Sequence, residues 1–171
     1  ILPLSLESIT DQIMVPQGDI VPFTFNTLVT EDAEKSLCQD APVLVVDDEP
    51  VNRFIIDHFC KRVNLRTKFA SDGVEALQLI EGLLEQGLAN QLPFKLIILD
   101  YQMPRMTGPE FAQRLMEISI ERELAKPPII GYTALTSRTE LEYFLDSGVI
   151  DILEKPTTFE KFIALIEKVV Q

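Results

Sequence analysis

Short runs of β-branched residues alternate with stretches of helical periodicity from Pro42 to the C-terminus, and this alternation limits the fold more than any other feature. The short runs lie near residues 43–46, 66–70, 95–99, 128–132 and 150–153. Helical patterns begin around Pro50 and continue over about 73–86, 108–122, 137–146 and 158–170. Such alternation is typical of βα units around one parallel sheet. The pattern therefore predicts an α/β domain with a doubly wound, five-stranded parallel sheet.

The apolar faces of three helices can be assigned from their spacing. In the first helix we expect the sheet-facing residues to be Val51, Phe54, Ile55 and Phe59. In the second they are Val74, Leu77, Ile80 and Leu84. The last helix has a broad apolar stripe of Phe162, Ile163, Leu165, Ile166, Val169 and Val170. Docking onto the sheet explains this stripe better than a partner-binding face does.

Residues 1–41 have a different character. Pro16-Gln-Gly-Asp19 is a turn signal between two runs that can pair as a hairpin, and residues 30–40 are acidic and polar enough to form a linker. The expected organisation is an N-terminal segment with an acidic linker over residues 1–41 and one α/β domain over residues 42–171. Because the chain starts at Ile1 and not at Met, we expect it to be part of a longer protein.

Composition narrows the classes of function. The 171 residues are 46% hydrophobic, which is enough for a substantial core. A formal charge of −12 argues against a nucleic-acid partner, since phosphate binding needs clustered Lys and Arg. Cys38 and Cys60 lack metal-ligand spacing and are too few for a disulfide framework, so we expect apolar filler residues in a reducing compartment. No apolar stretch approaches the ~20 residues of a membrane span, which predicts a cytoplasmic location without direct membrane contact.

Charged residues follow three of the predicted strands. Asp47 and Asp48 end the first run, Asp100 ends the third, and Lys155 with Pro156 follows the fifth. Open α/β sheets place their chemistry at the carboxyl ends of the strands. We therefore expect one acidic pocket with a lysine beside it.

The chemistry of such a pocket follows from its charges. Carboxylates about 5 Å apart repel by roughly 3 kcal/mol per pair at an effective dielectric of 20, so the cluster needs a counter-ion. Oxygen ligands select a hard cation such as Mg²⁺. An aspartate beside Mg²⁺ and Lys155 can attack a phosphoryl group. The hydroxyl of Thr133, at the end of the fourth run, can hydrogen-bond the new phosphoryl oxygens.

In these motifs the chain resembles the receiver domain of response regulators in two-component phosphorelay systems. The resemblance covers residues 43–171. It is carried by Val45-Val-Asp-Asp48, by Asp100-Tyr-Gln-Met-Pro104 with Gly108, by Ile129-Ile-Gly-Tyr-Thr-Ala134, and by Lys155-Pro156. Each piece is weak alone, but the set occurs in the family's order and at strand ends.

The resemblance implies a (βα)5 flavodoxin-like fold and a role for each site residue. Asp100 would be the phosphoacceptor, with Lys155 and Thr133 assisting it. Asp48 and Asp100 would ligate Mg²⁺ directly, Asp47 through water, and Gln102 through its main-chain carbonyl. The bond between Lys155 and Pro156 would be cis.

The resemblance also implies partners and a switch. The phosphodonor would be a phosphohistidine on a histidine kinase or a histidine phosphotransfer protein. Phosphorylation would draw Thr133 inward and alter the fourth helix, fifth strand and fifth helix, a surface that receivers use for partners or homodimers. Family members usually have Tyr or Phe three residues before the lysine, where this chain has Ile152, so the aromatic part of the switch is in question. Tyr132 is expected to pack against a helix.

Two further runs resemble parts of hybrid histidine kinases. Asp47-Asp-Glu-Pro-Val-Asn-Arg53 is similar to receivers fused behind sensor kinases, and Pro22-Phe-Thr-Phe-Asn-Thr-Leu28 is similar to the last strand of a kinase ATPase domain. The receiver itself would catalyse only its own phosphorylation and dephosphorylation, whereas the parent protein would be a histidine kinase. The expected location is the cytoplasm, either as a cytoplasmic protein or as the cytoplasmic part of a membrane-bound kinase.

Alternative interpretations remain open. The first is a receiver-like interaction module that takes no phosphate. The second is a Mg²⁺-dependent aspartyl phosphatase, although that chemistry needs a second acid where the chain has Gln102. A flavin-binding module is less consistent with the loops, which lack a phosphate cradle. His58 is assigned a structural or surface role, and Met103 and Met106 are assigned to loop packing.

Overall fold

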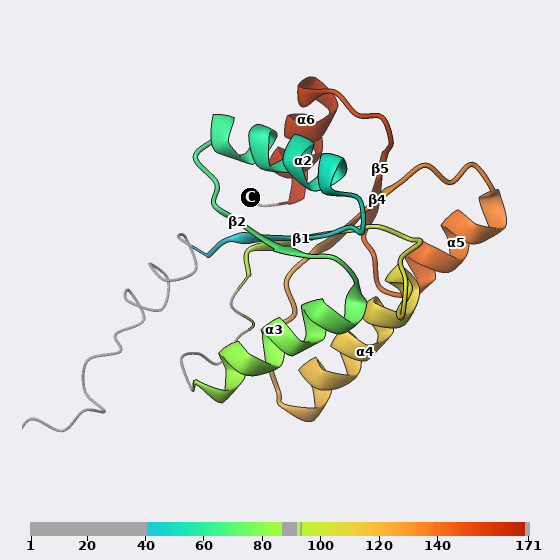
Figure 1. Cartoon of the computed structure of the whole chain (residues 1–171). Helices are drawn as coiled ribbons and strands as arrows, with labels where there is room; N and C mark the ends of the chain where they lie inside the picture. The colour runs from blue at the N-terminus through green and yellow to red at the C-terminus, as the bar shows by residue number, and fades with distance from the viewer. Residues whose placement is uncertain (1–40, 87–91, 93, 170–171) are drawn as a thin grey trace, which may run out of the picture. The chain divides into compact units, whose positions relative to one another are not determined.

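The computed structural model describes residues 41–86, 92 and 94–169. They form a five-stranded sheet with helices on both faces (Figure 1). The strands are β1 (Val43–Val46), β2 (Thr67–Ala70), β3 (Leu96–Leu99), β4 (Ile129–Thr133) and β5 (Asp151–Glu154). The helices are α2 (Pro50–Arg62), α3 (Gly73–Glu85), α4 (Gly108–Glu121), α5 (Arg138–Asp146) and α6 (Phe159–Val169). The hairpin and linker predicted within residues 1–41, and Val170, lie outside the described residues.

The sheet has the strand order β2-β1-β3-β4-β5, and every neighbouring pair is parallel. The chain leaves β1 toward one edge of the sheet and then crosses to β3 on the other side of β1. This is the doubly wound order of flavodoxin-like folds, in which the crevice between β1 and β3 is the usual place for a site. The predicted fold class is confirmed.

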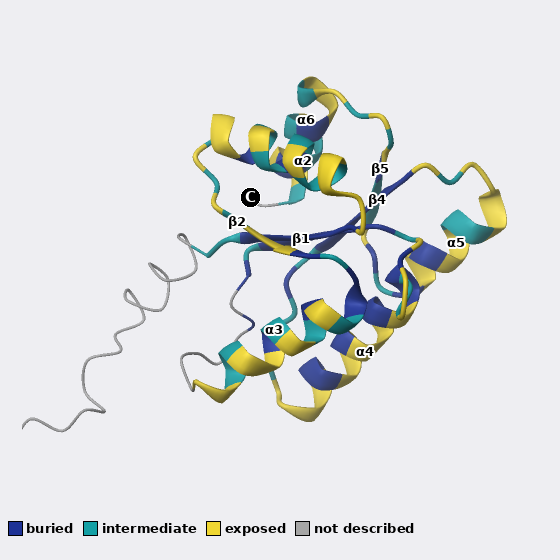
Figure 2. Ribbon diagram, in the orientation of Figure 1, coloured by how far each residue is buried: buried dark blue, intermediate teal, exposed yellow. Residues whose placement is uncertain are grey.

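Two apolar layers enclose the sheet (Figure 2). One lies under α3, α4 and α5 and includes Ile80, Phe111, Leu115 and Phe144. The other lies under α2 and α6 and includes Ile56, Cys60, Phe162 and Ile166. All residues of β1 and β3 are buried, because helices cover both of their faces. This is why these strands are continuous apolar runs without alternation.

The predicted ranges of all five strands are confirmed to within one residue at either end, and so are the helix ranges. The face predicted for α2 is wrong in part. Val51 and Phe54 are 58% and 69% exposed, and the residues that α2 buries are Ile56 and Cys60. Apolar residues occur on more than one face of this helix, so periodicity alone could not select the buried one. Cys60 is the apolar filler residue that was predicted.

Two glycines let segments approach one another closely. A Cβ atom on Gly108, the first residue of α4, would lie 2.2 Å from the carbonyl oxygen of Asp100. The Gly108 N–H donates to the Tyr101 carbonyl at 2.8 Å. A Cβ atom on Gly131 in β4 would lie 2.6 Å from the side chains of both Ile152 and Phe144. The loop after Asp100 is therefore closed tightly, and at Gly131 the side chains of Ile152, from the neighbouring strand β5, and of Phe144, from α5, lie close to the β4 backbone.

An ion pair also holds the loop between β3 and α4. Asp72 is 2% exposed and caps α3 by accepting a hydrogen bond from the Glu75 N–H at 2.9 Å. Its second carboxylate oxygen accepts from Arg105 Nε at 2.7 Å. Because Arg105 belongs to the loop between β3 and α4, this pair ties that loop to the start of α3.

None of the described helices is long and apolar enough to cross a membrane.

Candidate functional site

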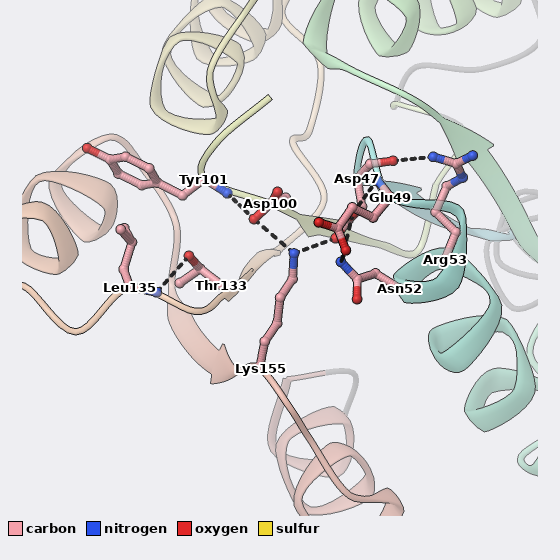
Figure 3. A network of polar contacts seen from close by, with 9 residues as sticks. All are labelled: Asp47, Glu49, Asn52, Arg53, Asp100, Tyr101, Thr133, Leu135 and Lys155. Carbon is pink, nitrogen blue, oxygen red and sulfur yellow. Dashed lines mark hydrogen bonds and ion pairs between the residues drawn. The ribbon is translucent and has the colours of Figure 1, made fainter. Parts of the chain in front are cut away.

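Figure 3 shows four of the predicted site residues, Asp47, Asp100, Thr133 and Lys155, at the carboxyl edge of the sheet. Asp47 and Asp48 follow β1, Asp100 follows β3, Thr133 ends β4, and Lys155 follows β5. The three aspartates each offer one carboxylate oxygen, and these atoms all lie within 4.8 Å of one another. Asp47 and Asp100 are buried, whereas Asp48 is exposed. The cluster of acids with a lysine beside it, expected from the strand ends, is present.

Lys155 bridges two of the carboxylates. Its Nζ lies 2.7 Å from Asp47 Oδ2 and 3.1 Å from Asp100 Oδ1. It also lies 5.0 Å from the centre of the Tyr132 ring. Burial by itself would lower the pKa of Lys155, but the close contact with Asp47 and the charge of Asp100 outweigh it and raise the pKa. Lys155 is therefore a permanent cation between the two acids.

Asp47 is held at both carboxylate oxygens. Oδ1 accepts hydrogen bonds from the Glu49 N–H at 2.9 Å and from Asn52 Nδ2 at 3.1 Å. Oδ2 is fully buried, and no described residue aligns a hydrogen-bond donor with it. Its charge partner is the Lys155 ammonium, 2.7 Å away.

The carboxyl group of Asp100 has a perturbed pKa. Burial raises this pKa, the charge of Lys155 lowers it in part, and the charge of Asp47 raises it again, giving about 6. Asp100 Oδ1 accepts a hydrogen bond from the N–H of Tyr101 at 2.8 Å. A perturbed carboxyl group among charge partners at a strand end is a typical functional-site feature.

Thr133, the last residue of β4, is buried. Its hydroxyl oxygen accepts a hydrogen bond from the Leu135 N–H at 3.2 Å. A pocket opens next to it, lined by residues of the loop after β4, by Leu141 and by the end of β5 with Lys155. The hydroxyl is thus fixed at the edge of a space that lies next to the lysine.

Two other predictions concern the loops around the site. The Lys155–Pro156 peptide bond is cis, as predicted. Gln102 is exposed in the loop after β3, and the role of its main-chain carbonyl as a ligand stays a prediction.

Ile152 and Tyr132 lie on opposite faces of the sheet. Ile152 is partly buried against the layer that contains Phe144. Tyr132 packs in the other layer with Phe162 and Ile166 of α6, which confirms that it faces a helix. Tyr101 contacts Phe144 edge to face, with ring centres 5.2 Å apart.

Sequence reasoning missed the contacts that hold Asp47. The amide of Asn52 donates to its carboxylate, and the guanidinium of Arg53 donates to its main-chain carbonyl. Both residues stand in the first turns of the helix that follows the two acids, and that position was the available signal. The ion pair between Asp72 and Arg105 was also missed.

The fold and the acidic site define a class of signalling domain, and comparison with known proteins names it. The model of the response regulator receiver domain family matches residues 43–167, so this chain belongs to that family. It is a receiver domain of two-component signalling, homologous to the receivers of hybrid sensor kinases.

Individual relatives and structures agree. Sensor histidine kinase RcsC of Escherichia coli K12 is 30% identical over 135 residues, which are 79% of this chain and 13% of that protein. Two-component response regulator 24 of Arabidopsis thaliana is 30% identical over 125 residues, covering 73% of this chain and 81% of that protein. The structure of the Vibrio cholerae chemotaxis protein CheY4 superposes with a TM-score of 0.62 at 28% identity, over 75% of this chain and 98% of that one. This chain thus spans only about an eighth of the sensor kinase RcsC.

Proposed function

We propose that Asp100 accepts a phosphoryl group from a phosphohistidine in a Mg²⁺-dependent reaction, and that the domain thereby switches conformation. The observation that supports this most is the carboxylate of Asp100, buried in a cluster of three acids and 3.1 Å from the Lys155 ammonium. The donor would be a histidine kinase or a histidine phosphotransfer protein. The relatives support this choice, since several are sensor histidine kinases.

The proposed transfer needs a nucleophile and neutralising charge. A carboxylate oxygen of Asp100 attacks the phosphorus atom, an O–P bond forms, and the N–P bond to the donor histidine breaks with its electron pair going to the imidazole nitrogen. Lys155 pairs with the phosphoryl oxygens that arrive beside Asp100, as a compact point charge. The pKa of about 6 leaves Asp100 mostly ionised at neutral pH, so its carboxylate can act as the nucleophile.

The acidic cluster fits Mg²⁺ by its donor chemistry. All candidate ligands are oxygen atoms, and the three carboxylates each offer one oxygen within 4.8 Å of the others. We propose that Asp48 and Asp100 ligate directly, Asp47 through water and Gln102 through its main-chain carbonyl. When bound, the ion supplies positive charge next to the transferring phosphoryl oxygens. Asp47 and Lys155 then hold the surrounding charges in place.

The switch begins at Thr133. A phosphoryl group adds a charge of about −2 and new acceptor oxygens. The Thr133 hydroxyl, now accepting from Leu135, can turn its own proton toward those oxygens and draw in the loop between β4 and α5. The altered surface would be α5, β5 and α6, where a partner or a second copy of the domain would bind. Because position 152 holds an isoleucine, no aromatic side chain would rotate inward there. The Ile152 side chain is packed against Gly131.

For the parent protein we propose a cytoplasmic hybrid histidine kinase, with the receiver over residues 42–171 and residues 1–41 forming the end of an upstream kinase domain and its linker. The sensor kinases among the relatives support this. Sequencing the reading frame upstream of Ile1 tests it. A histidine-bearing helix and an ATP-binding domain would be found there if the proposal is right.

Intact-mass spectrometry tests the chemistry directly. The protein is incubated with acetyl phosphate, with and without Mg²⁺, and compared with Asp100→Asn and with Asp146→Asn, an exposed carboxylate at the end of α5. We expect one Mg²⁺-dependent phosphoryl adduct in the wild type and in Asp146→Asn, and none in Asp100→Asn. A folded wild-type protein that binds Mg²⁺ but gains no adduct would support the interaction module instead.

A further inference from the structure

The first turns of α2 hold Asp47 at two points (Figure 3). Asn52 Nδ2 lies 3.1 Å from the carboxylate oxygen Oδ1, and the guanidinium of Arg53 donates to the main-chain carbonyl of the same residue. The helix begins at Pro50, so both residues are placed by the start of α2. The backbone and the side chain of Asp47 therefore have separate anchors on one helix.

These contacts determine which way the carboxylate points. Two donors share Oδ1, the Glu49 N–H at 2.9 Å and the Asn52 amide at 3.1 Å. With Oδ1 held, Oδ2 is turned toward Lys155, 2.7 Å away. Asp47 is only 1% exposed, so water cannot readily replace a donor that is lost. Rotation of the carboxylate would cost both hydrogen bonds at once.

The chemical type of the anchor matters as much as its position. A carboxamide donates a hydrogen bond without adding charge, so it orients the carboxylate and leaves its negative charge available to a cation. A lysine in that place would compete with the cation, and an aspartate would repel Asp47. The Asn52 amide also lies 3.4 Å from Glu49 Oε2, a second acceptor that favours the observed orientation of the amide.

We infer that Asn52 is a positioning residue for the cation site, acting through Asp47. This inference rests on the proposed function to the extent that the acidic cluster binds Mg²⁺. Partners of this kind around a metal ligand typically change metal affinity by about 10- to 100-fold when they are removed.

The test is a calorimetric titration of the full chain with Mg²⁺, comparing the wild type with Asn52→Leu and Asn52→Ala. Both replacements lack the donor, and both favour helix at least as well as asparagine, so α2 is retained. The matched control is His58→Ala, an exposed residue on the same helix. We expect the Mg²⁺ dissociation constant to rise about tenfold in both Asn52 variants and to stay unchanged in the control. Thermal unfolding in EDTA verifies that each variant is folded without the ion.

Two results would count against the inference in different ways. Unchanged Mg²⁺ affinity in folded Asn52 variants, with or without a lower melting temperature in EDTA, would overturn it and leave Asn52 with a purely structural role. If the wild type itself bound no Mg²⁺, the proposed cation site would fail and the inference with it. The wild-type titration thus separates the two failures.

Discussion

At the scale of single residues, the site places one acid in a costly position. Asp100 is buried beside Asp47, and Lys155 together with the Tyr101 N–H offsets only part of the cost of its negative charge. The pKa of about 6 lies above the ~3.9 of an aspartate in an unfolded chain. The folded domain therefore holds this proton more tightly than the unfolded chain does.

The pH dependence of stability follows from that difference. Below about pH 4, the raised pKa of Asp100 does not lower the free energy of unfolding. As the pH rises from about 4 to about 6, the folded state binds more protons than the unfolded state, so the free energy of unfolding falls. We expect Asp100→Asn to stabilise the Mg²⁺-free protein at pH 7.5 by about 3 kcal/mol, and the gain to vanish near pH 4. Urea unfolding of both proteins at the two pH values measures this. An equal gain at both values would show that ionisation is not its cause.

The charged residues of the candidate site could be predicted from the sequence because they directly follow buried strands. The positions of Asp47, Asp100 and Lys155 require only the strand ends and the parallel sheet. The contacts of Asn52 and Arg53 could not be predicted, because they depend on the side-chain conformations of α2. The pairing of Asp72 with Arg105 joins two loops that are distant in sequence, and neither loop has a pattern that indicates the other.

At the scale of elements, β4, β5 and α5 meet where Gly131 leaves room for two side chains. Ile152 and Phe144 occupy the space above this glycine. Strand positions were predictable from their apolar runs, but this contact was not, since it joins residues of three separate elements. The same limitation explains the wrong face of α2, where packing against α6 and the sheet decided between apolar faces.

A methyl group at Gly131 should disturb this contact. Its Cβ atom would lie 2.6 Å from both neighbouring side chains, so we expect Gly131→Ala to destabilise the domain by about 1 to 3 kcal/mol. The control is Gly82→Ala in α3, where nothing lies within 4 Å and a gain of up to about 1 kcal/mol is expected. Chemical denaturation measures both. Adding Ile152→Val should recover part of the loss at Gly131, and a neutral Gly131→Ala would refute the close packing.

At the scale of the whole molecule, the chain carries a formal charge of −12, and three of its acids meet at one edge of the sheet. The apolar layers on both faces of the sheet hold these acids close together. Their mutual repulsion therefore lowers the free energy of unfolding of the domain. A cation that binds only the folded domain should therefore stabilise it.

Thermal unfolding in increasing Mg²⁺ measures this coupling. At a hundredfold excess over the dissociation constant, binding contributes about 2.7 kcal/mol, and the melting temperature should rise by about 2 to 4 °C per kcal/mol. We expect the rise to continue with the logarithm of the concentration, to be reversed by EDTA, and to be lost in Asp48→Asn. Because Asp48 is exposed, this variant should melt like the wild type in EDTA. Stabilisation of Asp48→Asn equal to that of the wild type would place the bound ion elsewhere.

The bridge from Lys155 to Asp47 and Asp100 means that the domain carries a tethered positive charge of its own. The two buried acids are never without a neighbouring cation, even in water that contains no divalent ions. Metal sites that consist only of metal ligands, without a charged side chain to replace the ion, often leave a small domain unfolded when the metal is removed. Here we expect the emptied domain to keep its fold, so that it can bind and release a divalent ion repeatedly without unfolding.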